Sequence, residues 1–291
     1  VITQDGRHFF TSSNGIAELT FEYGQKKLRF IPTDCDALNG IENIGDWLIA
    51  VCADNKLINP KHKLIKINLS EINPYTNKPT ISTLFNLTNI ALPNGLTITP
   101  NKDAILIANY NLLGKGFISR LQINHSYDDL TPGKFDLKYL THKQGVYSAN
   151  GLKFYQGDLY VSDFKLKTLS SRIVKIDFIA DQYLDHQVLF SARTILDDLL
   201  PTCDGILVSD HLFGRLIFIS NRGKISRSRL QQFPGISSIL WGQTPLFPEK
   251  TLIITERGIL NDRHTLVGNQ ISSSNISDRV LSSIGADCSS L

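Results

Sequence analysis

The chain has 291 residues, of which 42% are hydrophobic, and its 30 Lys and Arg stand against 27 Asp and Glu. No apolar run approaches the roughly 18 residues of a membrane-spanning helix, and the formal charge of +3 lacks the concentrated basic face that nucleic-acid binding requires. We therefore expect a globular protein without a membrane span and without a nucleic-acid partner.

The first predicted elements are three short strands in residues 1–33. They lie in the stretches RHFFTSS, GIAELTF and KLRFIPT. They are short, rich in β-branched and aromatic residues and separated by turn residues, so they supply three strands of a first unit.

Four copies of one pattern follow, each made of an Asn-Gly or Asp-Gly pair, a strand, a turn and a second strand. The pairs are Asn39-Gly40, Asn94-Gly95, Asn150-Gly151 and Asp204-Gly205, in steps of 55, 56 and 54 residues. Asn-Gly commonly forms a hairpin turn, yet in LPNGLTITPNKDAILIANY the turn is supplied by residues 100–103. A step this regular indicates an internal repeat in which the pair has another purpose.

Further short strand patterns complete about four antiparallel strands in each repeat. They cover residues 64–69, 80–85, 117–123, 135–140, 172–178 and 187–190, and residues 234–270 add GISSILWG, TLIITERG and HTLVGNQIS. Four strands in every repeated unit are the signature of a propeller blade. We predict an all-β fold, a six-bladed β-propeller of four-stranded antiparallel blades.

The predicted blades make one domain over residues 1–291. Their approximate bounds are 1–33 plus a closing strand from the C-terminal segment, 34–90, 91–146, 147–200, 201–233 and 234–275, with a polar tail at 276–291. One helix is predicted, in SARTILDDLL (191–200), with Ser191 as N-cap and Pro201 as stop, in the loop that leads to Asp204.

In a propeller the first strand of every blade lines the central channel, and all first strands run the same way. Asn39, Asn94, Asn150 and Asp204 each precede such a strand, so we expect them at one mouth of the channel. Amide and carboxylate oxygens are hard ligands that suit Ca²⁺ or Mg²⁺. The alternative is that these pairs only form turns between blades, with water in the channel.

Several stretches resemble the senescence-marker-protein-30, gluconolactonase and paraoxonase group of six-bladed propellers, with strictosidine-synthase-like proteins as further relatives. They are LPNGLTITPNKDAILIANY, YSANGLKFYQGDLYVSD, PTCDGILVSD and FPGISSILWGQTPLFPEKTLIITERG. The resemblance implies one divalent metal, held by a Glu of the first blade, Asn94 and Asn150 of the third and fourth, and Asp204 of the fifth. Asn39 would line the substrate pocket.

The first-blade Glu is where this sequence departs from the family pattern. The first inner strand should run through VITQ, ahead of the Asp5-Gly6 turn, which puts that Glu at or before Val1. Glu18 lies in GIAELTF and reads as an ordinary strand residue. Because calcium affinity follows the charge of the ligands, a site without this Glu should bind metal more weakly.

These observations predict a divalent-metal-dependent hydrolase of lactones or small esters. The metal, Ca²⁺ first and Zn²⁺, Mg²⁺ or Mn²⁺ as alternatives, would polarise the carbonyl, and Asp204 would be both ligand and general base. His211, seven residues later, is a second pocket candidate. No GxSxG elbow, HExxH or phosphate loop offers rival chemistry. The competing hypothesis is a non-catalytic propeller that binds a small ligand or a protein.

The cysteines and the N-terminus bear on the compartment. Cys35, Cys52, Cys203 and Cys288 show no CxxC spacing, so sulfur-bound metal is not expected, and disulfides and free buried thiols both stay open. The chain starts at Val1 without a Met, which a cleaved signal peptide or a trimmed chain would explain. We expect a secreted or periplasmic monomer acting on a small molecule, with a cytoplasmic location as the alternative.

Overall fold

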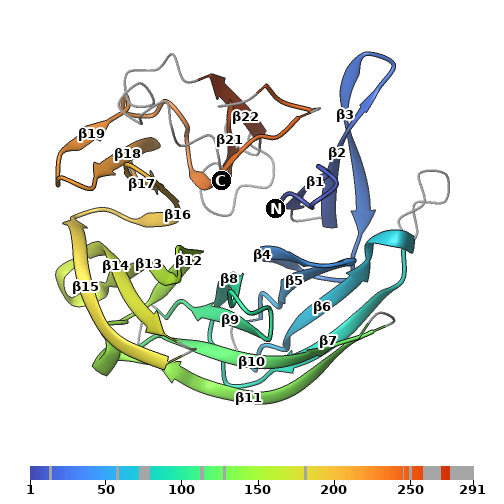
Figure 1. The fold of residues 1–291 in the computed structure, drawn as a ribbon, viewed down its shortest axis with the longest axis horizontal. Helices are drawn as coiled ribbons and strands as arrows, with labels where there is room; N and C mark the ends of the chain where they lie inside the picture. Colours follow the sequence, from blue (N-terminus) through green and yellow to red (C-terminus); the bar gives the residue numbers. More distant parts are fainter. Residues whose placement is uncertain are drawn as a thin grey trace. The chain divides into compact units, whose positions relative to one another are not determined.

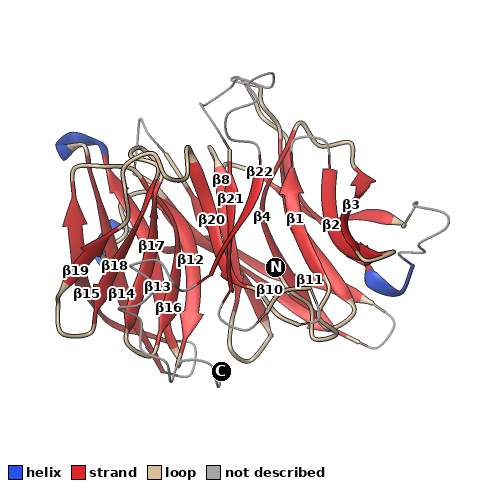
Figure 2. Cartoon of the chain, turned by 90° about the horizontal axis from the view of Figure 1, so that it is seen from above, coloured by secondary structure: helices blue, strands red, loops and turns tan. Residues whose placement is uncertain are grey.

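The structure is a computed structural model, and it consists almost entirely of β-strands (Figure 2). It describes residues 1–12, 15–56, 59–71, 79–111, 115–126, 129–179, 182–244, 246–248, 251–257 and 270–275. In this part of the chain the helical elements are three 3₁₀ turns, Leu69–Glu71, His142–Gln144 and Leu166–Thr168. No helix of the described residues is long and apolar enough to cross a membrane.

The strands form six small sheets (Figure 1). The first three sheets are β1 (His8–Ser12), β2 (Gly15–Glu22), β3 (Gln25–Pro32); β4 (Ala37–Ile44), β5 (Trp47–Ala53), β6 (His62–Asn68), β7 (Ile81–Leu87); and β8 (Pro93–Ile98), β9 (Ala104–Asn109), β10 (Phe117–His125), β11 (Leu130–Leu140). The last three are β12 (Ala149–Tyr155), β13 (Asp158–Lys165), β14 (Ser170–Ile179), β15 (Gln182–Ala192); β16 (Leu196–Thr202), β17 (Gly205–Asp210), β18 (Arg215–Ser220), β19 (Ile225–Arg227); and β20 (Ile236–Trp241), β21 (Thr251–Glu256), β22 (Gln270–Asn275).

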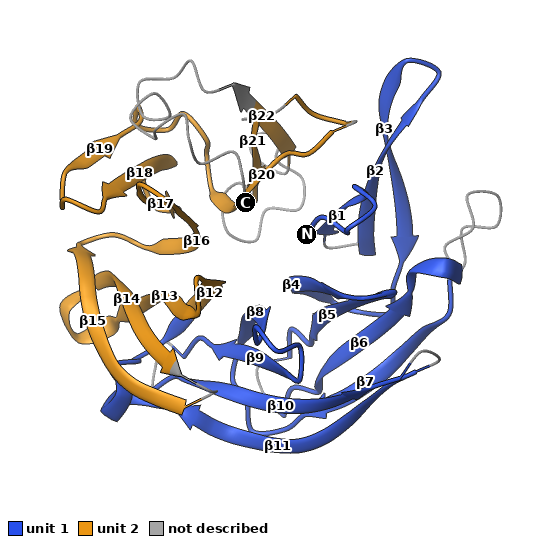
Figure 3. Ribbon diagram, viewed as in Figure 1, with its two compact units in different colours: residues 1–149 blue, residues 150–291 orange. Residues whose placement is uncertain are grey.

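Within each sheet the strands pair in chain order and antiparallel, as in the blades of a propeller. The fold is therefore the predicted all-β six-bladed propeller. The chain divides into two compact units, residues 1–149 and 150–291, coloured blue and orange in Figure 3. Each unit is described by itself below.

The first sheet has a short additional partner at its inner edge. Ile2 forms an antiparallel bridge with His8, and the amide of Phe9 donates to the carbonyl of Val1 at 2.9 Å. The VITQ stretch thus lies beside β1, as the sequence predicts. The closing strand is expected from the C-terminal segment, of which residues 258–269 and 276–291 lie outside the described residues, so this prediction is not tested.

The predicted helix at residues 191–200 is wrong. β15 runs to Ala192, and residues 196–202 form β16, the first strand of the fifth sheet. Leu196, Leu199 and Leu200 have the i, i+3, i+4 spacing of a helix face, but the register of β16 against β17 shifts between Leu196 and Leu199. A β-bulge at that shift adds a residue, so a strand reproduces the spacing of a helix.

Within each unit, neighbouring sheets pack face to face through separate apolar cores. In unit 1, Leu48 faces a cluster shared with the first sheet, whereas Ile49 faces one shared with the third. In unit 2, Val208 packs in a cluster shared with the fourth sheet, and Leu207 packs in a cluster shared with the sixth. Strands buried on both faces are expected to be apolar at every position, which accounts for β5, where all residues are buried.

The cysteines of the described residues are oxidised. Cys35 and Cys52 form a disulfide across 17 positions, beside β5, and Cys203 is also disulfide-bonded. No free cysteine is found in this part of the chain.

Candidate functional site

The first strand of several sheets carries the same short pattern, two polar or glycine residues between two apolar ones. The copies are Leu38-Asn39-Gly40-Ile41, Pro93-Asn94-Gly95-Leu96, Ala149-Asn150-Gly151-Leu152, Leu196-Asp197-Asp198-Leu199 and Ile236-Ser237-Ser238-Ile239. The register shifts at this pattern in β4, β8, β16 and β20. The Asn-Gly pairs therefore lie inside the first strands, at or beside bulges.

In unit 1 this pattern joins β4 to β8. The side-chain amide of Asn39 donates to the carbonyl of Pro93 at 2.7 Å. A Cβ on Gly40 would lie 2.6 Å from the backbone nitrogen of Leu96 and 2.8 Å from the carbonyl oxygen of Asn94. The pair Asn39-Gly40 thus holds two first strands in close contact, and half-buried Asn94 lies at the matching position of β8.

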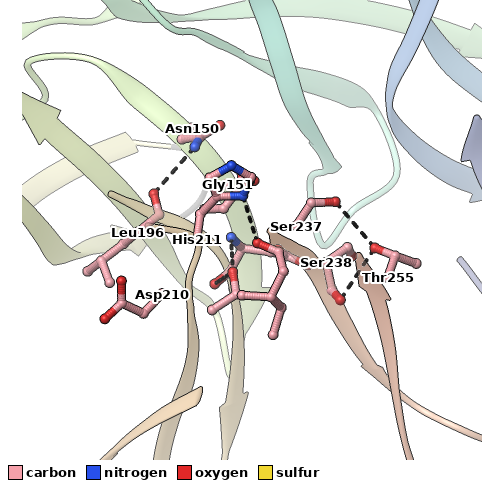
Figure 4. A network of polar contacts seen from close by, with 12 residues as sticks. Asn150, Gly151, Leu196, Asp210, His211, Ser237, Ser238 and Thr255 are labelled. Carbon is pink, nitrogen blue, oxygen red and sulfur yellow. Dashed lines mark hydrogen bonds and ion pairs between the residues drawn. The ribbon is translucent and has the colours of Figure 1, made fainter. Parts of the chain in front are cut away.

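In unit 2 the same arrangement joins β12 to β16 (Figure 4). Asn150, which is 5% exposed, donates through its side-chain amide to the carbonyl of Leu196 at 3.3 Å. A Cβ on Gly151 would lie 2.6 Å from the carbonyl oxygen of Asp197. Here the facing strand carries Asp197 and Asp198 where the copy in unit 1 carries Asn94 and Gly95.

The two carboxylates have different environments. Asp198 accepts hydrogen bonds through Oδ2 from the hydroxyl of Ser238 at 2.7 Å and from the amide of Ile239 at 3.1 Å. These bonds attach β16 to β20. Asp198 therefore has a structural role, and Asp197 is the carboxylate left for chemistry.

Asp197 is perturbed as functional carboxylates often are. Its side chain is 22% exposed. Burial, and next the charge of Asp198, raise the pKa of Asp197 to about 7, while Arg257 and a hydrogen bond from Asn150 act in the opposite direction. A carboxyl group in this state can hold or release a proton at neutral pH.

His211 lies beside this carboxylate, with Nδ1 3.7 Å from Oδ2 of Asp197, and its side chain is 12% exposed. Nδ1 is 3.0 Å from the carbonyl oxygen of Ile236. Because a carbonyl only accepts, Nδ1 carries the proton and Nε2 keeps its lone pair. Burial lowers the pKa of His211, despite the carbonyl contact, so the ring is neutral at neutral pH and Nε2 can accept a proton.

Arg257 supplies the positive charge of this neighbourhood. It directly follows β21, and its backbone amide donates to the carbonyl of Gly235 at 2.8 Å. Its side chain is exposed, and its charge acts to lower the pKa of both Asp197 and His211. Site residues Asn150, Asp197, His211 and Arg257 all belong to unit 2.

The structure does not bring Asp204 to Asn150. Asp204 is half-buried in the turn between β16 and β17, where its carbonyl accepts from the amide of Asn221. Asn150 contacts the other end of β16, at Leu196. Five strand residues, 198–202, lie between Asp197 and the turn that holds Asp204, which at the usual rise places the two residues roughly 16 to 20 Å apart. The Asp-Gly pair is a turn within the fifth sheet, not the start of its first strand.

An open groove of about 490 Å³ lies elsewhere, in unit 1, beside Asp34, Lys63 and Ile81. Asp34 and Lys63 form an ion pair at 2.9 Å, and no perturbed histidine or unpaired carboxylate lines the groove among the described residues. We therefore place the candidate site at Asp197.

Sequence reasoning found Asn150 and His211 but missed Asp197 and Arg257. The regular step of about 55 residues led to Asp204, whereas the fourth copy of the pattern comes after 47 residues, at Asp197. Two polar or small residues between apolar ones were the signal that identifies Asp197. Arg257 shows no such signal.

Comparisons with models of known protein families and with curated proteins give no match. Solved structures do match. The PQQ-bound aldose sugar dehydrogenase of Streptomyces coelicolor aligns with a TM-score of 0.66 at 12% identity, over 93% of this chain and 91% of that one. The fold is that of a β-propeller.

Two further matches belong to the group that the sequence resembles. Regucalcin of Agrobacterium tumefaciens, a calcium-binding protein, aligns with a TM-score of 0.57 at 15% identity, over 88% of this chain and 80% of that one. A putative gluconolactonase aligns with a TM-score of 0.55 at 18% identity, over 89% and 80%. At these identities the likeness shows the fold.

Proposed function

We propose that this protein is a hydrolase of lactones or small esters, with its reacting centre in unit 2 around Asn150, Asp197 and His211. The observation that carries the proposal is Asp197. It is a largely buried carboxylate with a pKa of about 7, 3.7 Å from the ring nitrogen of a neutral histidine. The structural likeness to a putative gluconolactonase supports the reaction class.

The residues at this position fit a divalent cation. The side-chain oxygens of Asn150 and Asp197 are the hard ligands that Ca²⁺ and Mg²⁺ prefer. The negative charge of Asp198 repels that of Asp197 and helps to raise the pKa of Asp197. A bound cation would reduce this repulsion. When bound there, a divalent cation polarises the substrate carbonyl and stabilises its developing negative charge. Asn94, in unit 1, remains a proposed further ligand.

The protein's own residues would handle the proton. Nε2 of His211 accepts a proton from the water that attacks the carbonyl, because Nδ1 is committed to the carbonyl of Ile236. The resulting imidazolium is stabilised by the nearby negative charge of Asp210. The acyl C–O bond then breaks, His211 returns the proton to the leaving oxygen, and an alcohol and a carboxylic acid are formed.

The test combines metal binding with turnover. We expect Ca²⁺, Mg²⁺, Mn²⁺ or Zn²⁺ to raise the melting temperature of the wild type as its concentration passes the dissociation constant. In a panel of lactones and aryl esters, Asp197→Asn should lose about a hundredfold or more in kcat, because the cation that stabilises the developing charge loses its charged ligand. Asp204→Asn is the matched control and should keep wild-type activity. A fully active Asp197→Asn variant, or a larger loss with Asp204→Asn, would contradict the proposal.

A non-catalytic propeller that binds a small ligand or a protein is the second candidate. One observation favours it: Asn39 and Asn150 both donate to the next strand, and Gly40 and Gly151 leave no space for a Cβ. Packing alone therefore accounts for two of the three Asn-Gly pairs, Asn39-Gly40 and Asn150-Gly151. Absence of turnover and of any thermal shift with all four metals would favour this function.

We further propose a secreted or periplasmic location. The disulfide between Cys35 and Cys52 supports it, because disulfides form and persist mainly in oxidising compartments. Labelling of thiols in freshly lysed source cells tests it, since a cytoplasmic protein would present reduced cysteines.

A further inference from the structure

Arg257 is held at the edge of the candidate site by its backbone. Its amide bonds to Gly235, and the next residue, Ile236, offers the carbonyl that orients His211. The last residue of β21, Glu256, pairs with Ile236 across the sheet. Neighbouring residues at the start of β20 therefore position both the histidine ring and the backbone of Arg257.

Arg257 is exposed, and within the described residues it takes part in no ion pair. Two half-buried arginines of the same unit are paired: Arg172 with Asp163, and Arg215 with Asp210 at 2.8 Å. Arg257 is therefore an exposed cation whose backbone is anchored at the site and whose charge already acts on Asp197, so it can contact a ligand bound there.

The charges of the site also favour an anionic ligand. Asp197 and Asp198 contribute up to two negative charges, and Arg257 contributes one positive charge. With the divalent cation of the proposed function the sum becomes positive, by about one unit. One negative group on the substrate would balance it, and the planar fork of an arginine suits a carboxylate, which it can bind through two parallel hydrogen bonds.

We infer that Arg257 binds a carboxylate carried by the substrate, so that the preferred substrates are lactones or esters with a second, anionic group. This inference rests on the proposed function and adds the substrate class to it. Arg257 is then a specificity-determining residue, because it contacts a part of the substrate that does not react.

The experiment compares two aryl esters of similar length, mono-p-nitrophenyl glutarate, which carries a carboxylate, and p-nitrophenyl pentanoate, which does not. The measured quantity is the ratio of their kcat/KM values. We expect Arg257→Gln to lower this ratio about tenfold to a hundredfold, since a charge-assisted hydrogen bond is lost. Arg257→Lys should retain part of the preference.

Arg222→Gln is the matched control. Arg222 is exposed in the turn between β18 and β19, next to Asn221, which contacts Asp204 at the far end of the fifth sheet. This variant makes the same change of net charge and should leave the ratio unchanged. An equal drop in both variants would show a general charge effect and would overturn the inference, as would an unchanged ratio in Arg257→Gln.

A binding measurement separates this inference from the proposed function. If the wild type hydrolyses neither ester with any of the four metals, the hydrolase proposal fails, and calorimetric titration with glutarate still tests Arg257. Glutarate binding that weakens tenfold or more in Arg257→Gln supports the inference. Absence of binding to the wild type, or equal binding to the variant, overturns it.

Discussion

The contact of β4 with β8 in unit 1 and that of β12 with β16 in unit 2 are built alike. In each, an asparagine donates to a carbonyl in the first strand of the following sheet, and the glycine after the asparagine permits close contact between the two strands. They differ in what the second strand presents: Asn94-Gly95 in β8, Asp197-Asp198 in β16. The asparagine and glycine of β4 and of β12 thus serve packing in both units. Of the two facing strands, β16 carries two acidic residues at the matching position, whereas β8 carries an uncharged pair.

The largest expected effect is the pH dependence that Asp197 adds to unit 2. Its pKa is raised from 3.8 to about 7 in the folded protein. Between these values the unfolded chain loses the proton while the folded protein keeps it, so the free energy of unfolding falls as pH rises, and it levels off above about pH 7. The full loss is about 4 kcal/mol, from roughly three pH units at about 1.4 kcal/mol each.

Denaturant unfolding in a chelator at several pH values measures this effect. The stability of Asp197→Asn relative to the wild type should rise between pH 4 and pH 7, and saturating Ca²⁺ should reduce the difference. Asp204→Asn is the control and should follow the wild-type curve. A wild type and an Asp197→Asn variant with parallel pH curves would show that Asp197 is not perturbed.

A smaller effect is expected from the glycines, and here the two units should behave alike. Gly40→Ala and Gly151→Ala each place a Cβ 2.6 Å from a backbone atom of the next strand. The strands must move apart, which should cost roughly 2 to 3 kcal/mol of stability in either unit. Gly133→Ala, on the exposed edge strand β11, meets its nearest atom at 3.2 Å and should change stability little. Equal stability of all three variants in urea would argue against a packing role.

The smallest expected effect separates the two asparagines. Asn39→Ala and Asn150→Ala each remove one side-chain hydrogen bond to the next strand, worth about 1 kcal/mol. Only Asn150 also donates to Asp197, so its loss should raise the pKa of that carboxyl further. The pH-dependent fall in stability should therefore continue to a higher pH in Asn150→Ala, whereas the curve of Asn39→Ala should shift in parallel. If the stability curves of both variants shift in parallel with that of the wild type, Asn150 has no influence on the pKa of Asp197.

Much of the fold could be predicted because turns and alternating strands are local signals. The turn at residues 100–103 separates β8 from β9 as the sequence indicates, and the pairing of Ile98 with Ile105 across it is observed. The failure at residues 191–202 has a physical cause, since the bulge between Leu196 and Leu199 gives strand residues the spacing of a helix.

The candidate site was less predictable because only Asn150 and Asp197 belong to the repeated pattern, while His211 and Arg257 do not. His211 was singled out from its place after Asp204, but its partner Asp197 was hidden in the predicted helix. Arg257 lies at the site because β21 pairs with β20. No local sequence pattern predicts this contact. The convergence of Asn94 with the residues of unit 2 stays a prediction.

The alternation of Leu207 and Val208 between two cores limits how this chain can change in length. One inserted residue in β17 would exchange the two faces and place each side chain against the wrong neighbour. Proteins with single insertions or deletions in the turns should therefore still fold, whereas the same changes inside a strand should destabilise the fold. A library of random one-residue deletions selected for folding should accordingly be depleted across β5 and β17 and populated at the turns that flank them.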